Sequence, residues 1–331
     1  MSVKLAFVGF RHPHIMPLYD AAKLNPGVKI VGACEEDADT RERLVAGGKV
    51  EVTHGCFSRM LAEVDCDAVA VGDYFGRRGY LAIQALKAGK HVIADKPLCT
   101  SLAELTQIRE LAEQKQLKVG CMFTMRDMAT YQTMRRLIND GRIGEPHSII
   151  ITGMHPLNIG TRPQWFFMPG CHGGTIIDIG VHVFDVVKWL SGHAITEICS
   201  ARSWNGKAKD YPWFEDCAQF MLKLDNGCGV FADVSYLAPG KCGYSVKQYW
   251  RCTVAGDTGT IEVQNGDSNV TLVTDEDATP QLVPAELTEH EDYLEDFLAD
   301  INGKVAVCHS DTADVLEKHR QALETQVAAT K

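Results

Sequence analysis

His91-Val92-Ile93-Ala94-Asp95-Lys96-Pro97 joins a short strand of apolar residues to a charged turn. Six such apolar segments alternate with helical segments in the first third of the chain, and a strand that is apolar throughout is buried on both faces. This alternation predicts a parallel sheet covered by helices on each side. The predicted strands cover residues 5–8, 28–34, 50–53, 68–71, 91–94 and 118–121.

The pattern changes after about residue 122, where longer segments are typical of antiparallel strands. Two of the turns between them contain Asp225-Asn226-Gly227 and Asp257-Thr258-Gly259, which favour tight reversals. A chain of 331 residues exceeds what one hydrophobic core usually covers. The sequence therefore predicts an α/β domain over residues 1–121 and an α+β domain with a mostly antiparallel sheet over residues 122–331.

Composition limits the classes of partner. The net charge of −10 disfavours general affinity for nucleic acid or anionic membranes. No apolar stretch reaches the ~20 residues that a membrane span needs, and the N-terminal residues contain no pattern of a cleaved signal peptide. The twelve cysteines include no CxxC pair, which favours free thiols in a reducing compartment. We expect a cytoplasmic protein without a nucleic-acid or membrane partner.

Three residues have the chemistry to remove a proton from an alcohol while a hydride leaves. Lys96 follows an apolar strand, at the sheet edge where open α/β folds bind ligands. Asp178 and His182 follow a Gly-Gly loop with a spacing that places both on one helix face. We predict His182 as general base, Lys96 as the cation beside the alkoxide and Asp178 as the orienting carboxylate. The structural alternatives are a buried histidine, a surface lysine and a helix N-cap.

The turn after the first strand is Gly9-Phe10-Arg11-His12-Pro13-His14. It keeps only the first glycine of the G-x-G-x-x-G signature of dinucleotide sites, although Arg11 can supply a cation to a phosphate. Glu35 ends the second strand, where a carboxylate accepts hydrogen bonds from the adenosine ribose and repels a 2′-phosphate. NAD is thus favoured over NADP. Equally, Glu35 and Glu36 have the position of caps for the following helix.

Further polar and aromatic residues near these segments are candidates for the substrate site. Arg162 offers a guanidinium for hydroxyl or carboxylate groups, whereas Trp165 is equally suited to packing. The residues predicted to bind substrate are His14, Arg162, Trp165 and His172. His12 and His14 form an H-x-H pattern that could recruit Cys171, His172 or His155, but no ligand set is evident. We predict no metal.

Two segments resemble the family of glucose-fructose oxidoreductases, inositol dehydrogenases and rhizopine-catabolism proteins (Gfo/Idh/MocA). They are the run from Ala85 to Val92 that leads into Asp95-Lys96-Pro97, and the Gly-Gly run with Asp178, Gly180, His182 and Asp185. The resemblance implies a Rossmann domain, an α+β domain whose open sheet often mediates oligomers, and catalytic roles for Lys96, Asp178 and His182.

The chain departs from the family pattern in two segments besides the glycine turn. Asp95 replaces the glutamate of E-K-P, and the loop A-T-P-N-x-x-H has Asp73, Tyr74 and Arg78 in place of threonine, proline and histidine. That loop lies beside the nicotinamide in relatives. The predicted cofactor-binding set is Gly9, Phe10, Arg11, His12, Glu35, Asp73, Tyr74 and Lys96.

The resemblance implies an NAD-dependent dehydrogenase for a secondary alcohol of a sugar, inositol or related polyol. We expect a homodimer or homotetramer that forms through the C-terminal sheet. Two alternatives remain. One is a lyase or hydrolase that keeps NAD bound and oxidises its substrate transiently. The other is a non-catalytic binding protein with the same fold, which the altered glycine turn motivates.

Overall fold

The computed structural model describes residues 2–277, 279–287, 293–304 and 310–330. The chain divides into two compact units. The first unit contains Met1–Met122, Gly170–Gly173 and Glu291–Arg320, and the second contains Phe123–Pro169, Gly174–His290 and Gln321–Lys331. Two segments from the later part of the chain thus complete the unit that the N-terminal residues begin.

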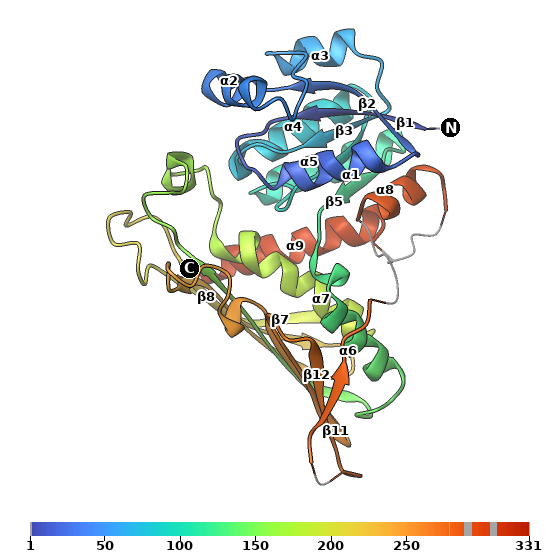
Figure 1. Cartoon of the computed structure of the whole chain (residues 1–331), viewed down its shortest axis with the longest axis vertical. Coiled ribbons are helices and arrows are strands. Elements are labelled where there is room, and N and C mark those ends of the chain that lie inside the picture. Colours follow the sequence, from blue (N-terminus) through green and yellow to red (C-terminus); the bar gives the residue numbers. More distant parts are fainter. Residues whose placement is uncertain (1, 278, 288–292, 305–309, 331) are drawn as a thin grey trace. The chain divides into compact units, whose positions relative to one another are not determined.

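The first unit is built on a parallel sheet of five strands in the order β2-β1-β3-β4-β5 (Figure 1). The strands are β1 (Val3–Val8), β2 (Val28–Cys34), β3 (Ala68–Val71), β4 (His91–Ala94) and β5 (Val119–Cys121). The helices of this unit are α1 (Ile15–Leu24), α2 (Ala38–Gly47), α3 (Phe57–Glu63), α4 (Phe75–Lys87), α5 (Leu102–Lys115) and α8 (Tyr293–Ile301). Helix α9 (Thr312–Ala329) begins in this unit and ends in the second one. The parallel Rossmann-like sheet confirms the predicted fold class.

The predicted strand over residues 50–53 is wrong. This segment lies beside the end of β2, where the Thr53 N–H donates to the Ala33 carbonyl and the adjacent His54 forms an isolated bridge with Cys34. The Thr53 hydroxyl accepts from the Ala33 N–H at 3.1 Å, so a side chain occupies a donor that a regular ladder would pair with a carbonyl. Apolar content alone does not reveal this substitution of a side chain for a backbone partner.

Local signals set several helix ends. Asp37 caps α2 by accepting from the Thr40 N–H at 2.9 Å, and the helix ends at Gly48 in the left-handed conformation. Helix α5 starts with a Ser-x-x-Glu sequence, in which the Ser101 hydroxyl accepts from the Glu104 N–H at 3.2 Å. These caps satisfy amide groups that a helix start leaves without an intrahelical partner.

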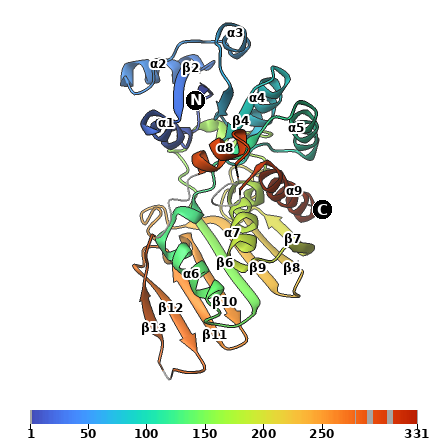
Figure 2. The ribbon, with the colours of Figure 1, turned by 90° about the vertical axis from the view of Figure 1, so that its right-hand side faces the viewer.

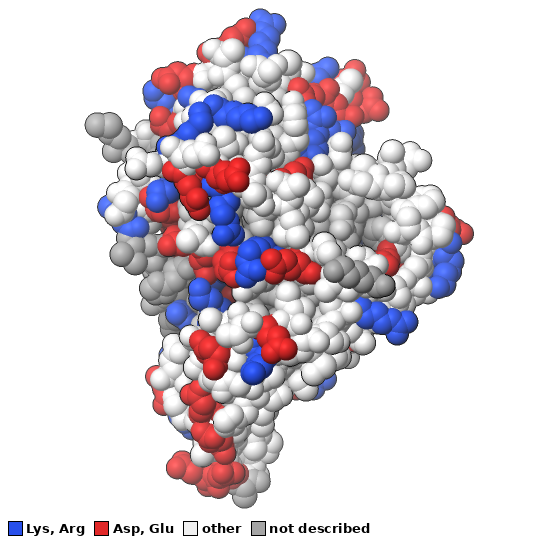
Figure 3. Space-filling view, turned by 180° about the vertical axis from the view of Figure 1, so that it is seen from behind, with Lys and Arg blue, Asp and Glu red and all other residues white. Residues whose placement is uncertain are grey.

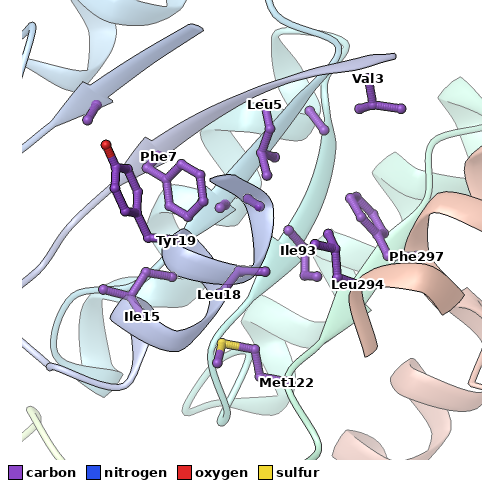
Figure 4. Packing of buried hydrophobic residues seen from close by; sticks show 14 of the residues in the cluster. Val3, Leu5, Phe7, Ile15, Leu18, Tyr19, Ile93, Met122, Leu294 and Phe297 are labelled. Atoms are coloured by element: carbon purple, nitrogen blue, oxygen red, sulfur yellow. The ribbon is translucent and has the colours of Figure 1, made fainter. Parts of the chain in front are cut away.

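The core on one side of the first sheet includes residues from the far end of the sequence. Figure 4 shows Leu5 and Phe7 of β1 near residues of α1, with Leu294 and Phe297 of α8 in the same cluster. A Cβ added to Gly120 of β5 would lie 2.9 Å from the Phe297 ring. Helix α8 therefore packs directly on the parallel sheet, and this core needs it.

The second unit contains an eight-stranded sheet in the order β13-β12-β11-β10-β6-β9-β8-β7. Its strands are β6 (Pro146–Pro156), β7 (Ile195–Trp204), β8 (Cys217–Leu224), β9 (Gly229–Ala238), β10 (Arg251–Gly256), β11 (Gly259–Gln264), β12 (Asn269–Thr274) and β13 (Gln281–Pro284). The strands pair antiparallel except for β6 with β9, which confirms the α+β prediction. The edge strand β13 is short and ends in proline, and the sequence did not predict it. Helices α6 (Ala129–Asn139) and α7 (Val181–Ser191) lie against one face of this sheet (Figure 2).

The other face of the second sheet has an apolar row across its middle strands. Ile150 pairs in register with Phe231, and Phe231 pairs with Met221. These side chains are 48%, 37% and 48% exposed, respectively. Because directly opposed residues on neighbouring strands point to the same face, they form one continuous apolar strip.

In the view of Figure 3, lysines and arginines lie among acidic side chains, and broad parts of this face hold neither. Every helix among the described residues is too short or too polar to cross a membrane.

Candidate functional site

The predicted site residues divide between the two units. The first unit holds Gly9, Phe10, Arg11, His12, His14, Glu35, Asp73, Tyr74, Lys96 and His172, and the second holds Arg162, Trp165, Asp178 and His182. In the first unit, most of them lie at the carboxyl ends of β1 to β4, which is where open parallel sheets bind ligands.

The turn after β1 requires glycine at its first position. Gly9 has φ +78°, its N–H donates to the Cys34 carbonyl at 3.0 Å, and its carbonyl accepts from the Asp73 N–H at 3.0 Å. A Cβ at Gly9 would lie 2.5 Å from the Cβ of Asp73. The glycine that survives from the dinucleotide signature is thus the one at which the turn packs against the end of β3.

Arg11, which replaces the second glycine of the signature, is held by an ion pair. Its Nε and Nη2 donate to the Asp73 carboxylate at 2.5 and 3.0 Å, and its guanidinium lies 4.5 Å from the centre of the Tyr74 ring. Although burial lowers the pKa of Arg11, Asp73 outweighs this effect and raises it. Asp73 has φ +77°, an uncommon conformation for a residue other than glycine that recurs at functional sites. The structure therefore brings three predicted cofactor residues together.

Glu35 lies at the end of β2 and is fully buried. One carboxylate oxygen accepts from the Phe10 N–H at 2.6 Å and the other from the Asp37 N–H at 2.8 Å. Burial raises the pKa of Glu35 despite these two hydrogen bonds. The carboxylate thus joins the β1 turn to the residue that caps α2. The cap itself is Asp37 and not Glu35, so the capping interpretation of Glu35 is wrong. Each Glu35 oxygen has a further lone pair, and a hydrogen bond from a ribose hydroxyl to one of them stays a prediction.

Beneath this turn lies a buried polar network centred on Arg78. This side chain is fully buried, and it donates to the Asp95 carboxylate at 2.5 Å and to the Asp73 carbonyl at 3.1 Å. It also donates to the carbonyl of Lys96, which itself is 7% exposed. Burial acts to raise the pKa of Asp95, but Arg78 and the hydrogen bond with His12 hold it well below its usual range. The sequence identified Arg78 only as a departure from the family pattern.

The two histidines of the turn lie near the same carboxylate. His12 Nδ1 lies 2.9 Å from Asp95 Oδ2, and His14 Nδ1 lies 3.9 Å from Asp95 Oδ1. Burial lowers the pKa of His12, and Asp95 opposes this effect only in part. These three residues have ligand atoms within 4.8 Å of one another, as a metal site would. However, Arg78 Nη2 donates to Asp95 Oδ2 at 2.5 Å, so a guanidinium already neutralises this carboxylate. The absence of a metal remains a prediction.

In the second unit, Asp178 and His182 lie on a π-helical turn and the α-helix that follows it. The turn covers Ile176–Gly180, and α7 continues from Val181. The Ile176 N–H donates to the side-chain oxygen of Gln326 at 2.9 Å, and a Cβ at Gly174 would lie 2.3 Å from that side chain. The sequence predicted a regular α-helical spacing between Asp178 and His182. Instead, Asp178 lies in a π-turn, a feature that recurs at functional sites.

Asp178 has a partner that the sequence did not reveal. The Tyr236 hydroxyl, from β9, donates a hydrogen bond to the Asp178 carboxylate. Burial and the adjacent carboxylate raise the pKa of Tyr236 well above its ordinary value, so the phenol stays protonated and donates. The two residues are distant in sequence, and no spacing rule connects a strand tyrosine with a carboxylate on another element.

Arg162 is used mainly in local structure. Its Nε and Nη2 donate to the carbonyls of Leu157 and Pro156 at 3.0 and 3.1 Å. Its guanidinium lies 4.2 Å from the centre of the Phe166 ring and 5.4 Å from that of Tyr236. These contacts agree with a structural role for the segment, while a substrate role for Arg162 stays a prediction.

Aromatic side chains surround the second-unit residues. The His182 ring lies 5.4 Å from Trp250 and 6.1 Å from Phe123, measured between ring centres. A second group surrounds His155, at centroid distances of 4.8 to 6.2 Å, and consists of Tyr236, Tyr244, Tyr249 and Trp250. Because Trp250 belongs to both groups and Tyr236 binds Asp178, the carboxylate and imidazole lie in one aromatic neighbourhood.

The first unit is thus a parallel sheet with a lysine at its edge, and the second holds a carboxylate paired with a tyrosine and an imidazole in the same aromatic neighbourhood. The family model described as "Oxidoreductase family, NAD-binding Rossmann fold" matches residues 3–123, and the model described as "GFO/IDH/MocA C-terminal domain" matches residues 131–262. The chain belongs to the Gfo/Idh/MocA family of oxidoreductases. This confirms the predicted family and the prediction of NAD as the cofactor.

Relatives with assigned activities include inositol dehydrogenases. Inositol 2-dehydrogenase 1 of Saccharopolyspora erythraea is 28% identical over 241 residues, which cover 72% of this chain and 66% of the relative. The scyllo-inositol 2-dehydrogenase (NAD(+)) of Bacillus subtilis is 25% identical over 314 residues, which cover 92% of this chain and 86% of the relative. The matched segment thus spans about two thirds of the first relative and most of the second.

Solved structures show the same fold. An inositol dehydrogenase homolog from Azotobacter vinelandii, complexed with NADH and myo-inositol, superposes with a TM-score of 0.78 at 18% identity. The superposition covers all of this chain and 96% of that one. An NAD-binding protein from Listeria innocua gives a TM-score of 0.80 at 19% identity, over 99% and 95% of the two chains. At this identity, the similarity supports the fold and not the substrate.

Proposed function

We propose that this protein is an NAD-dependent dehydrogenase that oxidises a secondary alcohol of an inositol, sugar or related polyol, or catalyses the reverse reduction. The observation that supports it most is the Asp178 carboxylate, which a buried tyrosine holds in place one short segment before His182. A fixed carboxylate beside an imidazole suits the deprotonation of a hydroxyl group.

The residues have distinct roles in this proposal. His182 accepts the hydroxyl proton, since an imidazole exchanges protons near neutral pH. Lys96 donates a hydrogen bond to the same oxygen and stabilises the alkoxide. Asp178, oriented by Tyr236, accepts from a substrate hydroxyl. NAD supplies the hydride acceptor when it is bound.

The cofactor site in this proposal is at the edge of the first sheet. The turn at Gly9 and the cation of Arg11 face the pyrophosphate, while Asp73 and Tyr74 lie beside the nicotinamide. The carboxylates of Glu35 and of its neighbour Glu36, both at the end of β2, disfavour a 2′-phosphate, so NAD is the preferred cofactor. Residues 1–121 bind the cofactor, and residues 122–331 provide the substrate site.

A neutral ring polyol fits the second unit better than a sugar acid. Aromatic rings cluster around His155, and aromatic ring faces suit the C–H faces of a cyclic polyol. Two nitrogens of Arg162 donate hydrogen bonds to backbone carbonyls, so its guanidinium is poorly placed for bidentate binding of a carboxylate. His14, Trp165 and His172 are proposed as further substrate contacts.

The proposal is tested with Lys96→Met and His182→Gln variants, assayed for NADH formation on a panel of inositols, sugars and sugar acids. We expect each substitution to lower kcat by ~10²-fold or more, while calorimetric NAD affinity changes little. Lys29→Met and His147→Gln, both at exposed positions, are matched controls. Unchanged turnover in both test variants would refute the assigned roles.

The same assays separate the two alternative functions. A wild-type protein that releases a modified product without net NADH formation would favour a lyase or hydrolase that retains its cofactor. A protein that fails to bind NAD at millimolar concentration would favour a non-catalytic binding role, and it would count against both enzymatic functions.

The open face of the second sheet is proposed to mediate homodimers or homotetramers. The strip of Ile150, Phe231 and Met221 is apolar and exposed in the single chain. Phe231→Glu is expected to shift the mass measured by light scattering towards the monomer. Leu24→Glu, at an exposed apolar residue of the first unit, is the control. A monomeric wild-type protein would refute this assembly.

The cytoplasmic location of the protein remains a prediction. The cysteines among the described residues are free thiols, as expected for a protein of the cytoplasm.

A further inference from the structure

Arg78 has an unusually complete set of buried contacts. It lies in the first turn of α4 and has no exposed surface. A buried guanidinium must find acceptors for its donors, because water is not available to them. Nη1 lies 3.1 Å from the Asp95 carbonyl and 3.4 Å from that of Pro97, and it also donates to the Lys96 carbonyl between them. One cation therefore gathers three consecutive carbonyl groups.

The same guanidinium is bound by an acidic side chain. Arg78 Nη2 donates to Asp95 Oδ2 at 2.5 Å, and Asp95 is 1% exposed. Nε donates to the Asp73 carbonyl at 3.1 Å, at the end of the neighbouring strand. Arg78 thus ties the ends of β3 and β4 together at the point where Lys96 leaves the sheet.

We propose that Arg78 is the positioning residue for Lys96, with Asp95 as its fixed counterion. The inference rests on the proposed function, because that function gives Lys96 its role at the substrate oxygen. Lys96 has a long and flexible side chain, so the direction of its main chain decides where its ammonium group can reach. Three carbonyls fixed on one guanidinium define that direction.

The sequence gives independent support for a coupled pair. Asp95 and Arg78 are two of the positions at which the chain departs from the family pattern, which has glutamate and histidine there. In the structure, these two departures contact each other. The two departures from the family pattern thus lie at one ion pair.

The test is an Arg78→Lys substitution in the full-length protein. Lysine keeps the positive charge, but its single ammonium group cannot reach three carbonyls and a carboxylate together. We expect kcat to fall by roughly 10²-fold, as for a displacement of about 1 Å at a catalytic group, while KM and the NAD dissociation constant stay within about threefold. An Arg78→Lys variant with wild-type kcat would overturn the proposal.

A double-mutant cycle with Lys96→Met shows whether Arg78 acts through the lysine. In the Lys96→Met background, we expect Arg78→Lys to have no further effect on kcat. An equal reduction in both backgrounds would overturn the proposal, since it would show that Arg78 contributes independently of Lys96.

Two variants control for a general loss of stability. Arg126→Lys makes the same exchange at another buried arginine, whose Nη2 donates to Asp185 at 2.6 Å in the second unit. We expect a similar decrease in Tm but no dependence of its kinetic effect on Lys96. If Arg78→Lys does not fold, Arg78→Met combined with Asp95→Asn removes the pair without leaving a lone buried charge. The kinetic expectations are the same for this variant.

A crystal structure of the variant provides a readout that does not depend on activity. We expect the carbonyls of residues 95–97 to rotate and the Lys96 Nζ to move relative to β4. An unchanged main chain would overturn the inference. A wild-type protein that oxidises no polyol would instead overturn the proposed function, while the crystal structure would still report on the positioning of Lys96.

Discussion

Tyr236→Phe removes one oxygen atom from the candidate site and leaves its packing in place. The Tyr236 ring lies 5.6 Å from Phe166 and 5.7 Å from Phe214, and a phenylalanine keeps both contacts. What is lost is the hydrogen bond from the hydroxyl to the Asp178 carboxylate. The substitution therefore isolates the contribution of this bond.

The magnitude follows from the charge of the acceptor. A hydrogen bond to a charged group contributes about 1.5–3 kcal/mol, and the remaining carboxylate stays buried. If the bond acts fully on the oriented carboxylate in the transition state, kcat/KM falls by about 10- to 150-fold, since each 1.36 kcal/mol is tenfold in rate. The Tm of the second unit is expected to fall by a few degrees.

The assay measures kcat/KM from NADH absorbance on the polyol that the wild-type protein oxidises. Tyr131→Phe is the matched control, because Tyr131 is buried in α6 and its hydroxyl has no hydrogen-bond partner within the described residues. We expect this control to retain wild-type kinetics and to be equally or more stable. A Tyr236→Phe variant within twofold of wild type would show that the Asp178 orientation does not depend on Tyr236, or that Asp178 is not catalytic.

Three further substitutions test the first unit. Gly9→Ala is expected to lower the free energy of unfolding by about 2–4 kcal/mol in urea titrations, because it adds a clash with Asp73 to the left-handed conformation. Gly89→Ala, also left-handed but in open space, should lose only the conformational part, and equal losses would refute the clash. Asp95→Asn should flatten the acid limb of the stability curve: the depressed pKa of Asp95 means that its stabilisation is present above its unfolded pKa near 4 and is lost as pH falls. Glu35→Gln should act with the opposite sign, because burial raises the pKa of Glu35 and stability is lost as pH rises through that pKa. Titrations across acidic pH would contradict this reasoning if the variant and wild-type curves were parallel.

The sequence predicted the two-part architecture well because strand polarity differs between the units. Strands such as β3 and β4 are apolar throughout and predict a parallel sheet. In the second unit, recognisable turn sequences connect neighbouring strands and predict antiparallel pairs. The segment over residues 50–53 was predicted wrongly, since a Thr53 hydroxyl takes the place of a ladder hydrogen bond. Whether a segment forms a strand depends on the neighbouring strand with which it pairs, and the sequence of the segment alone does not reveal that neighbour.

The candidate site was predicted in part for a similar reason. Lys96, Asp178 and His182 were predicted because they lie in recognisable local motifs, and their catalytic roles stay predictions. Tyr236 and Arg78 were missed as partners because their contacts connect residues far apart in the chain. Glu35 was correctly placed at the end of a strand, but only coordinates reveal that its two oxygens accept from backbone N–H groups.

The packing of α8 against the parallel sheet has a consequence for synthesis of the protein. Leu294 and Phe297 belong to the same core as residues of β1 and α1, yet the ribosome adds them after almost all of the chain. Until they emerge, the nascent sheet presents an uncovered apolar surface beside Gly120. The nucleotide-binding unit is therefore begun first and completed nearly last. Premature termination would leave a fragment with exposed apolar surface that is prone to aggregate, instead of a folded nucleotide-binding unit.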